Sequence, residues 1–304
     1  MITIVGSLNM DAIARVHTLP LPGETVLARS LERVPGGKGA NQAVAAAKAG
    51  SEVVMVGRVG TDAYGDELTA SLRQAGVRLD CLAVDNEHPT GIAMVSVDDQ
   101  GENSIVVVQG ANGFLTEREV ERAEAVIAAS NVVVAQLEIP LESVRKAAEM
   151  TRAVGATFML NPAPALQLDR DLLALVDVLV PNEDELARMT GLGAPIDAAA
   201  CAHLLRDTGV PVIVVTRGAI GALIVTREEE QEIPAVVSGI VDTTGAGDAF
   251  VGNLAHALDK RMPLQGAVRF ANAAAAQSVR HHGAQTAMPS ELETLNLLQG
   301  DMPS

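Results

Sequence analysis

The sequence predicts an α/β fold in which a doubly wound, mainly parallel sheet has helices on both faces. Short apolar runs alternate with amphipathic stretches along nearly the whole chain. These runs consist almost entirely of Val, Ile and Leu, which is typical of parallel strands buried on both faces. The chain has 304 residues, enough to bury a large core. Strand and helix alternating in this way favour one α/β domain over residues 1–304.

The elements follow from where each pattern begins and ends. Strands are expected at residues 2–6, 52–57, 132–136, 157–161, 176–180 and 212–216. Helices are expected between them at residues 40–49, 117–129, 141–154 and 198–207, and again at 249–258. The charged run 227–230 is expected to form the solvated tip of a hairpin.

Two segments interrupt this alternation, at about residues 11–34 and 90–108. Neither contains a convincing helix, and each has a turn signal, at residues 20–23 and 98–102. Short antiparallel strands are therefore expected in both. Together they could form one small β-sheet over an edge of the core, as a lid or a subunit contact. The alternative is two unrelated surface hairpins.

Composition excludes several classes of protein. The chain has 22 Lys and Arg against 38 Asp and Glu, a net charge of −16, which argues against a nucleic-acid surface. Only 2% of the residues are aromatic, so aromatic stacking platforms are almost excluded. No apolar run reaches the roughly 18 residues of a membrane span, and the first residues read as a strand rather than a signal peptide. Cys81 and Cys201 have no metal-ligand spacing, so we expect a cytoplasmic protein with reduced thiols.

The segment 241–250 is the most informative for chemistry. Gly245 and Gly247 form a turn that leads directly into a helical pattern. Unpaired N–H groups at a helix N-terminus suit an anion, and glycine lets that anion approach the backbone closely. A carboxylate beside a bound phosphate is unusual, which points to Asp248 as a general base that takes a proton from an attacking hydroxyl. The alternative is that Asp248 only complements the helix dipole.

A second glycine cluster, residues 36–43, also opens a helix. This is not a Walker A loop, because Glu32 stands where that motif has its first glycine and Gly39 stands where it has Ser or Thr. Lys38 and Asn41 could donate hydrogen bonds to a ligand here. A packing turn without a ligand is the alternative.

Polar residues also follow several predicted strands, at the sheet edge where α/β proteins bind ligands. They are Asn9 and Asp11, Glu138, Asn182 and Glu185, and Thr216, Arg217, Gly218 and Gly221. Amides and carboxylates at such an edge suit the many hydroxyl groups of a sugar. Each residue alone could equally be a turn, cap or solvated surface residue.

Taken together, these segments resemble the ribokinase branch of the PfkB sugar-kinase family. The resemblance runs from residues 7–11 to residues 283–285, and the two family signatures correspond to residues 36–43 and 242–248. Residues 57–62 and 161–164 also resemble the family. The resemblance implies a ribokinase-like fold and a lid that pairs subunits into homodimers.

The resemblance also implies roles for individual residues. It makes Asp248 the catalytic base and Gly245, Ala246 and Gly247 the anion hole. The sugar-binding positions are Asn9, Asp11, Gly37, Lys38, Asn41 and Glu138, together with Asp248. The ATP-binding positions are Asn182, Thr216, Arg217, Gly218, Gly221, Gly247 and Asn272.

Metal ions are implied in the same way. Asn182 and Glu185 fall on a motif associated with Mg²⁺. A monovalent cation, usually K⁺, is implied at Asp242, Thr244, Ser278, His281, Gly283 and Ala287. Ala287 departs from the serine common in the family, so one hydroxyl ligand is missing.

The expected activity is transfer of a phosphoryl group from ATP to the primary 5-hydroxyl of D-ribose, giving ribose 5-phosphate. The alternatives are 2-deoxyribose or another sugar or nucleoside, and more remotely a non-catalytic sugar-binding protein on the same fold. A dinucleotide-dependent oxidoreductase lacks the N-terminal glycine fingerprint.

Overall fold

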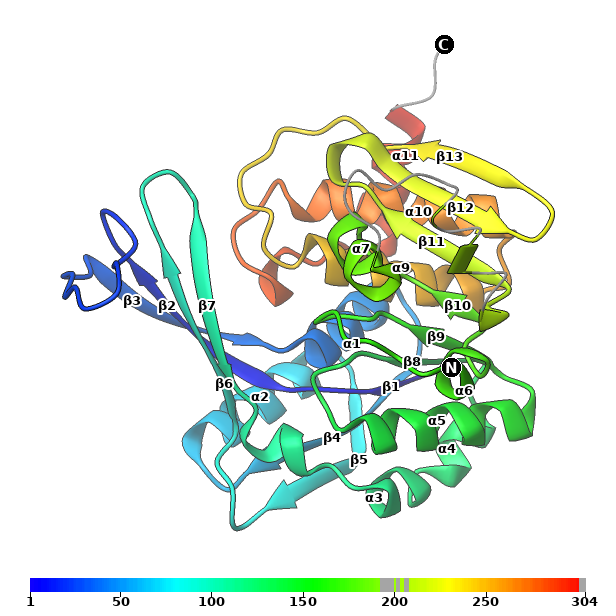
Figure 1. Cartoon of the computed structure of the whole chain (residues 1–304), viewed down its shortest axis with the longest axis horizontal. Coiled ribbons are helices and arrows are strands. Elements are labelled where there is room, and N and C mark those ends of the chain that lie inside the picture. The colour runs from blue at the N-terminus through cyan, green and yellow to red at the C-terminus, as the bar shows by residue number, and fades with distance from the viewer. Residues whose placement is uncertain (192–199, 201–202, 205–207, 301–304) are drawn as a thin grey trace.

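The main sheet contains nine strands in the order β13-β12-β11-β10-β9-β8-β1-β4-β5 (Figure 1). The computed structural model describes residues 1–191, 200, 203–204 and 208–300. From β11 to β5 all neighbours pair in parallel, and β12 and β13 add an antiparallel edge. The strand bounds are β1 Ile2–Val5, β4 Val53–Gly60, β5 Arg78–Asp85, β8 Val132–Ala135, β9 Thr157–Leu160, β10 Val178–Leu179, β11 Val212–Thr216, β12 Gly221–Thr226 and β13 Glu230–Pro234.

Helices cover both faces of this sheet. One core cluster packs the sheet against α1 (Lys38–Lys48), α2 (Ala63–Gln74), α9 (Ala246–Asp259) and α10 (Leu264–Ser278), with α11 (Glu291–Gly300) beside α10. The other cluster packs it against α3 (Glu117–Glu121), α4 (Glu124–Ala128), α5 (Leu141–Val154), α6 (Arg170–Leu173) and α7 (Glu183–Thr190). Within β1, Ile2 and Ile4 join the first cluster and Val5 joins the second. The predicted doubly wound fold is therefore confirmed.

Two expected helices are not found as single described helices. The single helix expected over residues 117–129 is wrong, because the chain turns at Ala123 (ψ 10°) and forms α3 and α4 instead. The turn keeps Val120, Ala123 and Ile127 buried in one cluster. The helix expected over residues 198–207, including Cys201, lies largely outside the described residues. The charged run 227–230 connects β12 to β13, as expected for a hairpin tip.

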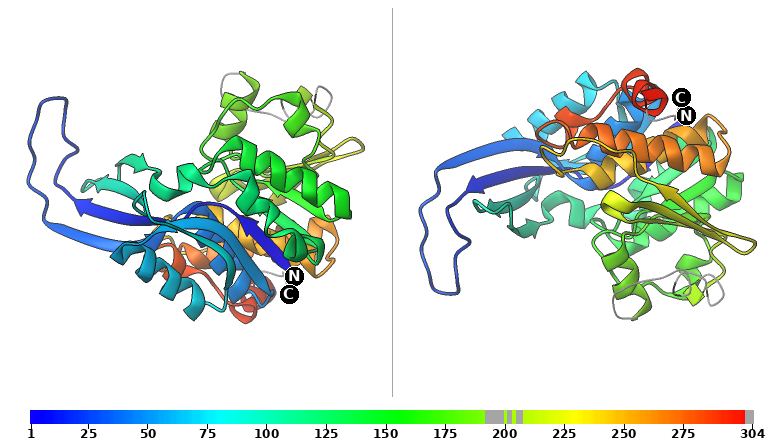
Figure 2. Two further views of the ribbon diagram at one scale, coloured as in Figure 1. Left: turned by 90° about the horizontal axis from the view of Figure 1, so that it is seen from below. Right: turned by 90° about the horizontal axis from the view of Figure 1, so that it is seen from above.

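The two segments that interrupt the alternation form one small sheet, which projects from the α/β core in Figures 1 and 2. Its order is β3-β2-β6-β7, with bounds β2 Asn9–Arg15, β3 Ser30–Gly36, β6 Gly91–Val97 and β7 Asn103–Val108. We call this sheet the lid. Two unrelated hairpins are excluded, since β2 pairs with β6. Within each segment the two strands pair antiparallel, as expected, and the β2–β6 pair that joins the segments is parallel. Both strands leave the core in the same direction.

Within the part of the chain that the structure describes, no helix combines the length and apolarity needed to cross a membrane. That one domain spans residues 1–304 stays a prediction.

Candidate active site

The N-terminus of α9 lies at the centre of the candidate site. Gly245 caps the helix with φ 74°, in the left-handed region that favours glycine. A β-carbon there would also come 2.9 Å from the Ala284 β-carbon. Among the described residues, the amides of Gly247 and Asp248 have no backbone acceptor, as expected in a first helical turn. This end of α9 can therefore donate hydrogen bonds to an anion.

Asp248 lies in that first turn and receives two amide donors from α1. Asn41 Nδ2 donates to Asp248 Oδ2 over 2.9 Å, and Gln42 Nε2 donates to Asp248 Oδ1 over 2.9 Å. The two glycine-rich segments, about 200 residues apart in the sequence, are thus joined through one carboxylate.

The surroundings of Asp248 set its proton affinity. Burial raises the pKa of Asp248 above its ordinary value. The Lys38 ammonium and the amide donors of Asn41 and Gln42 oppose that rise. A carboxylate with a raised pKa that still accepts hydrogen bonds is suited to take a proton.

Glu138 connects the predicted sugar-binding residues. Its Oε2 accepts hydrogen bonds from Ser7 Oγ, from Asn9 Nδ2 at 3.5 Å and from the Lys38 amide at 3.2 Å. Glycine at position 37 lets this backbone lie close to Asn9. Its φ is 86°, and a β-carbon there would come 2.5 Å from the backbone nitrogen of Asn9.

Asp11 faces the same cluster from β2. Its pKa is raised to about 7 by burial and by the neighbouring carboxylates of Glu138 and Asp248, while Lys38 acts in the opposite direction. Lys38 lies among four carboxylates. Burial works against its charge, but Asp248, Glu138, Glu185 and Asp11 together raise the pKa of the ammonium. The cluster therefore holds one positive charge among several negative ones.

Two cavities adjoin the N-terminus of α9. The smaller, of about 170 Å³, is polar and is lined among others by Lys38, Asn182, Glu185, Gly247 and Asp248. The larger, of about 400 Å³, is mainly apolar. They share Thr216, Thr243, Ala246 and Gly247. The two cavities therefore continue into each other at the helix N-terminus.

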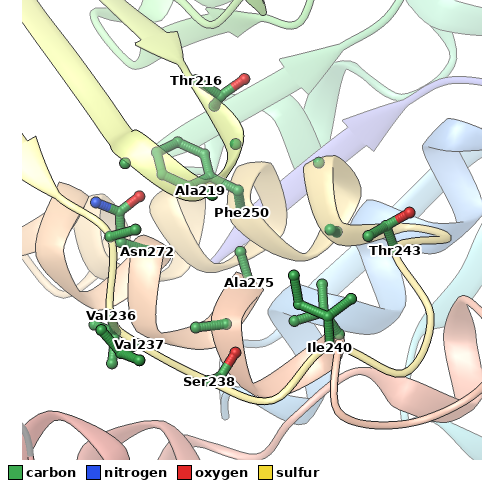
Figure 3. Close-up of a pocket in the computed structure, with 17 residues that line it drawn as sticks. Thr216, Ala219, Val236, Val237, Ser238, Ile240, Thr243, Phe250, Asn272 and Ala275 are labelled. Carbon is green, nitrogen blue, oxygen red and sulfur yellow. The ribbon is translucent and has the colours of Figure 1, made fainter.

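Figure 3 shows the larger cavity between the β11–β12 turn, helices α9 and α10, and the loop that follows β13. Phe250 of α9 and Asn272 of α10 face it, with Val236, Val237 and Ile240 on the loop. Val237 is 86% exposed and Ile240 is 66% exposed, so apolar side chains surround an open cavity. Such a cavity fits a flat, mostly apolar group held between aliphatic side chains.

Most predicted ATP-binding residues line these cavities. They are Thr216, Gly218, Gly221, Gly247 and Asn272 in the larger, and Asn182, Thr216 and Gly247 in the smaller. Arg217 does not line either cavity. Its guanidinium binds Glu183 through Nε at 3.3 Å and Glu232 through Nη1 at 2.9 Å. The structure therefore brings the predicted nucleotide residues together with the exception of the Arg217 side chain.

The positions predicted for Mg²⁺ form a capping box. Asn182 Oδ1 accepts from the Glu185 amide at 2.7 Å, and Glu185 Oε2 accepts from the Asn182 amide at 2.8 Å. Burial raises the pKa of Glu185, opposed by its bond to Asn182 and by Lys38. Across the described residues, no group of three or more His, Cys, Asp or Glu side chains is arranged to hold a metal. One carboxylate beside a phosphate-sized cavity still fits Mg²⁺ that arrives with a nucleotide.

Three of the positions predicted for a monovalent cation, Asp242, Thr244 and Gly283, are joined by hydrogen bonds. Asp242 Oδ1 accepts from the Thr244 amide and hydroxyl, and Asp242 Oδ2 accepts from the Gly283 amide at 2.9 Å. Burial opposes the charge of Asp242, but these bonds lower its pKa and keep it ionised. The Ser278 hydroxyl donates to Ala275 O.

The other two predicted positions differ from each other. His281 is exposed and Ala287 is buried. The ionised Asp242 carboxylate and the Thr244 hydroxyl are oxygen ligands of the kind that a hard cation prefers.

Sequence reasoning assigned no role to several buried polar residues at the site. Asn112 Nδ2 donates to Asn9 Oδ1 at 2.8 Å and to Leu8 O at 2.9 Å, which fixes the Asn9 amide. Gln42 and Asn161 bond to each other beside Asp248. The sequence offers one signal for these residues. Gln42 is a polar residue within the alanine-rich stretch 39–47.

Comparisons with known proteins agree with this arrangement. The family model described as pfkB family carbohydrate kinase matches residues 1–291. A ribokinase of Haemophilus influenzae is 37% identical over 98% of each chain. A deoxyribokinase of Salmonella typhi is 39% identical over 95% of each chain. The structure of Arabidopsis thaliana ribokinase complexed with ribose and ATP superposes with a TM-score of 0.90 and 32% identity, over 98% of each chain.

Proposed function

The chain belongs to the pfkB family of carbohydrate kinases, and from this premise we propose that it phosphorylates the primary 5-hydroxyl of D-ribose with ATP. One observation carries the proposal. Asp248 lines the smaller cavity and also bonds to Asn41 among the predicted sugar-binding residues. Relatives named ribokinase, and a solved ribokinase that holds ribose and ATP, support ribose as the sugar.

In this proposal the sugar is held by hydrogen bonds. Asn9, Asp11, Gly37, Lys38, Asn41 and Glu138 provide donors and acceptors on one side of Asp248. Asn41 Oδ1 is buried and lacks a hydrogen-bond partner among the described residues, so it is available to accept from a sugar hydroxyl. Only 2% of the residues are aromatic, which fits recognition of hydroxyl groups better than stacking of a base.

The adenine of ATP would occupy the larger cavity, and its phosphates the smaller one. Asp248 takes the proton from the sugar hydroxyl as that oxygen attacks the γ-phosphorus, and the bond from phosphorus to the β-phosphate oxygen breaks to release ADP. The proposed anion hole is the α9 N-terminus at Gly245, Ala246 and Gly247, where the amides of Gly247 and Asp248 have no backbone acceptor among the described residues and can donate where negative charge develops. Mg²⁺, held with ATP near Glu185 and Asn182, supplies neutralisation of phosphate charge when bound. Positioning and electrostatic stabilisation are the main requirements of phosphoryl transfer.

2-Deoxyribose is the second candidate, favoured by the deoxyribokinase relative. The two sugars differ by one hydroxyl, at C2. A coupled assay of ADP release should compare ribose, 2-deoxyribose, fructose and a nucleoside under identical ATP. We expect ribose to give the highest kcat/KM. A higher kcat/KM for 2-deoxyribose would reassign the substrate, and no stimulation by any of them would leave the non-catalytic sugar-binding alternative.

We also propose that K⁺ binds at the loop around Asp242 and activates the enzyme. The carboxylate of Asp242, kept ionised and next to the Thr244 hydroxyl, supports the site. Initial rates in K⁺, Na⁺ and a bulky organic cation at equal ionic strength test it. Equal rates in all three would contradict K⁺ activation.

The lid is proposed to close over the sugar and to pair two subunits as a homodimer in the cytoplasm, where ATP is available. Exposed apolar side chains of the lid support a subunit contact. They are Leu31, Met94, Ile105, Val106, Val107 and Val108. Light scattering after size exclusion should give twice the mass of 31.5 kDa. A monomeric mass at micromolar concentration would contradict the dimer.

A further inference from the structure

Gln42 is a buried amide that touches Asp248 and lines neither cavity. We propose that Gln42 is a positioning residue whose fixed hydrogen bond holds Asp248 Oδ1 in place for proton transfer. The inference deepens the proposed function and rests on it, because it assumes that Asp248 is the general base.

All the hydrogen-bonding groups of the Gln42 side chain are used. Nε2 donates to Asp248 Oδ1 at 2.9 Å and to Asn161 Oδ1 at 3.1 Å. Oε1 accepts from Gln136 Nε2 at 2.6 Å. The residue is 0% exposed, so water does not replace any of these partners. The amide is therefore held from three sides.

Chemistry fixes the direction of this amide. An ionised carboxylate only accepts hydrogen bonds, so the NH₂ of Gln42 must face Asp248 and its carbonyl must face Gln136. Gln136 then donates to Gln42, and Gln136 Oε1 is left buried without a partner among the described residues. Gly6 leaves room for that oxygen, since a β-carbon at Gly6 would collide with it. An unpaired buried carbonyl destabilises the fold. Here it results from an arrangement in which Gln136 donates to Gln42 and Gln42 donates to Asp248.

Asn41 and Gln42 divide the two carboxylate oxygens between them. Asn41 binds Oδ2 and has a carbonyl oxygen left for the sugar, whereas Gln42 binds Oδ1 and has nothing left to offer a ligand. A change at Asn41 should therefore alter both sugar KM and kcat. A change at Gln42 should lower kcat and leave sugar KM nearly unchanged.

Gln42 also opposes the rise in the pKa of Asp248 that burial causes. The titratable groups that face Asp248 are Lys38, Glu138, Asp11 and Glu185, and each stays in place when only Gln42 is replaced. A difference in pH dependence between the wild type and a Gln42 variant therefore reports the lost amide donor.

The test compares the wild type with Gln42→Met, which keeps the side-chain length and removes the donor. We expect kcat for ribose phosphorylation to fall about tenfold or more, sugar KM to stay within about twofold, and the acid limb of kcat to move to higher pH. Gln136→Met, which only frees the Gln42 amide to turn, should shift the limb less and in the same direction. Asn253→Leu removes a buried amide on α9 whose one hydrogen bond among the described residues is to Ala249 O, and it should leave the limb in place.

A second readout does not need turnover. The ¹³C resonance of the Asp248 carboxyl, assigned by its absence in Asp248→Asn, should titrate at higher pH in Gln42→Met than in the wild type or Asn253→Leu. An unchanged midpoint together with an unchanged kcat limb overturns the inference. If no sugar stimulates ATP turnover in the wild type, the proposed function fails while the resonance still tests the contact. If Gln42→Met does not fold, the same two measurements on Gln136→Met decide the question.

Discussion

The Asp11 side chain lies against Gly36, its diagonal neighbour across the β2–β3 pair, so closely that a β-carbon at Gly36 would come 2.6 Å from Asp11 Oδ1. The other Asp11 oxygen is nearer still. Glycine at position 36 therefore determines where the Asp11 carboxylate can lie. Asp11 is a predicted sugar ligand, so a change at Gly36 should affect sugar binding.

Gly36→Ala should displace Asp11 and raise the KM for ribose about tenfold, equivalent to about 1.4 kcal/mol of lost binding. The KM for ATP should not change, because neither Gly36 nor Asp11 lines either cavity. Steady-state kinetics with each substrate varied in turn measure both constants. Gly266→Ala is the control, since a β-carbon there meets nothing within 4 Å. Equal ribose KM values in the two variants would contradict the role of Gly36.

Asp11 should make sugar binding depend on pH. Its pKa of about 7 means that it is mostly protonated at pH 6 and mostly ionised at pH 8. The ionised form accepts sugar hydroxyls better, so the ribose KM should fall roughly tenfold between these two pH values. Asp11→Asn should have a higher KM without this pH dependence. A wild-type ribose KM that does not change from pH 6 to pH 8 would contradict this role of Asp11.

The same group affects stability in the absence of sugar. Since the folded-state pKa of Asp11 is raised from 3.8 to about 7, the folded protein binds more protons than the unfolded chain in that range. The contribution of Asp11 to the free energy of unfolding should therefore decrease as pH rises through this range. Measured by urea denaturation, the free energy of unfolding should decrease less between pH 5 and pH 7 in Asp11→Asn than in the wild type.

Asp248→Asn should abolish turnover while leaving sugar binding largely intact. The amide cannot accept the proton of the attacking hydroxyl, so kcat should fall by about 10² or more. Calorimetry with ribose should still detect binding. Asp66→Asn, an exposed carboxylate in the first turn of α2, is the matched control. A variant that keeps a tenth of the wild-type turnover would exclude Asp248 as the base.

Lys48→Met should destabilise the segment that follows α10. Lys48 Nζ, at the C-terminal end of α1, donates to the carbonyl oxygens of Gln285 at 2.9 Å and Met288 at 3.2 Å. Losing charged donors to these carbonyls should cost about 1–3 kcal/mol and lower the Tm. Lys146→Met is the control, because Lys146 pairs with the exposed carboxylates of Glu117 and Glu121 at the surface. Thermal unfolding of both variants checks this, and equal Tm values would contradict the prediction.

The central strands could be predicted from the sequence because burial on both faces leaves continuous apolar runs. Strand β5 has only a short apolar run, at residues 81–84. β5 lies at the edge of the sheet, and polar Arg78 and Asp80 alternate with apolar residues in its first half. The division of 117–129 into α3 and α4 also has no clear signal, since the buried residues stay on one face in either form.

The predicted site residues fall mainly on strand ends and helix N-termini, where topology alone brings them together. Contacts between distant side chains were not predictable in this way. Asn112 reaches Asn9 from 103 residues away. Arg217 was assigned to the nucleotide, yet it meets Glu183 on α7 and Glu232 on β13. Nothing in the local sequence of Arg217 identifies these partners.

Strand β2 begins at Asn9 in the sugar-side cluster and ends at Arg15 in the lid. The lid is therefore not a separable module. A chimaera that took its lid from a relative would import the donor's residues at positions 9 and 11 as well, and with them part of the donor's sugar preference. Deleting the lid would likewise remove two predicted sugar ligands along with the cover. For protein engineering, altering sugar choice and altering the cover of the site are one design problem in this fold.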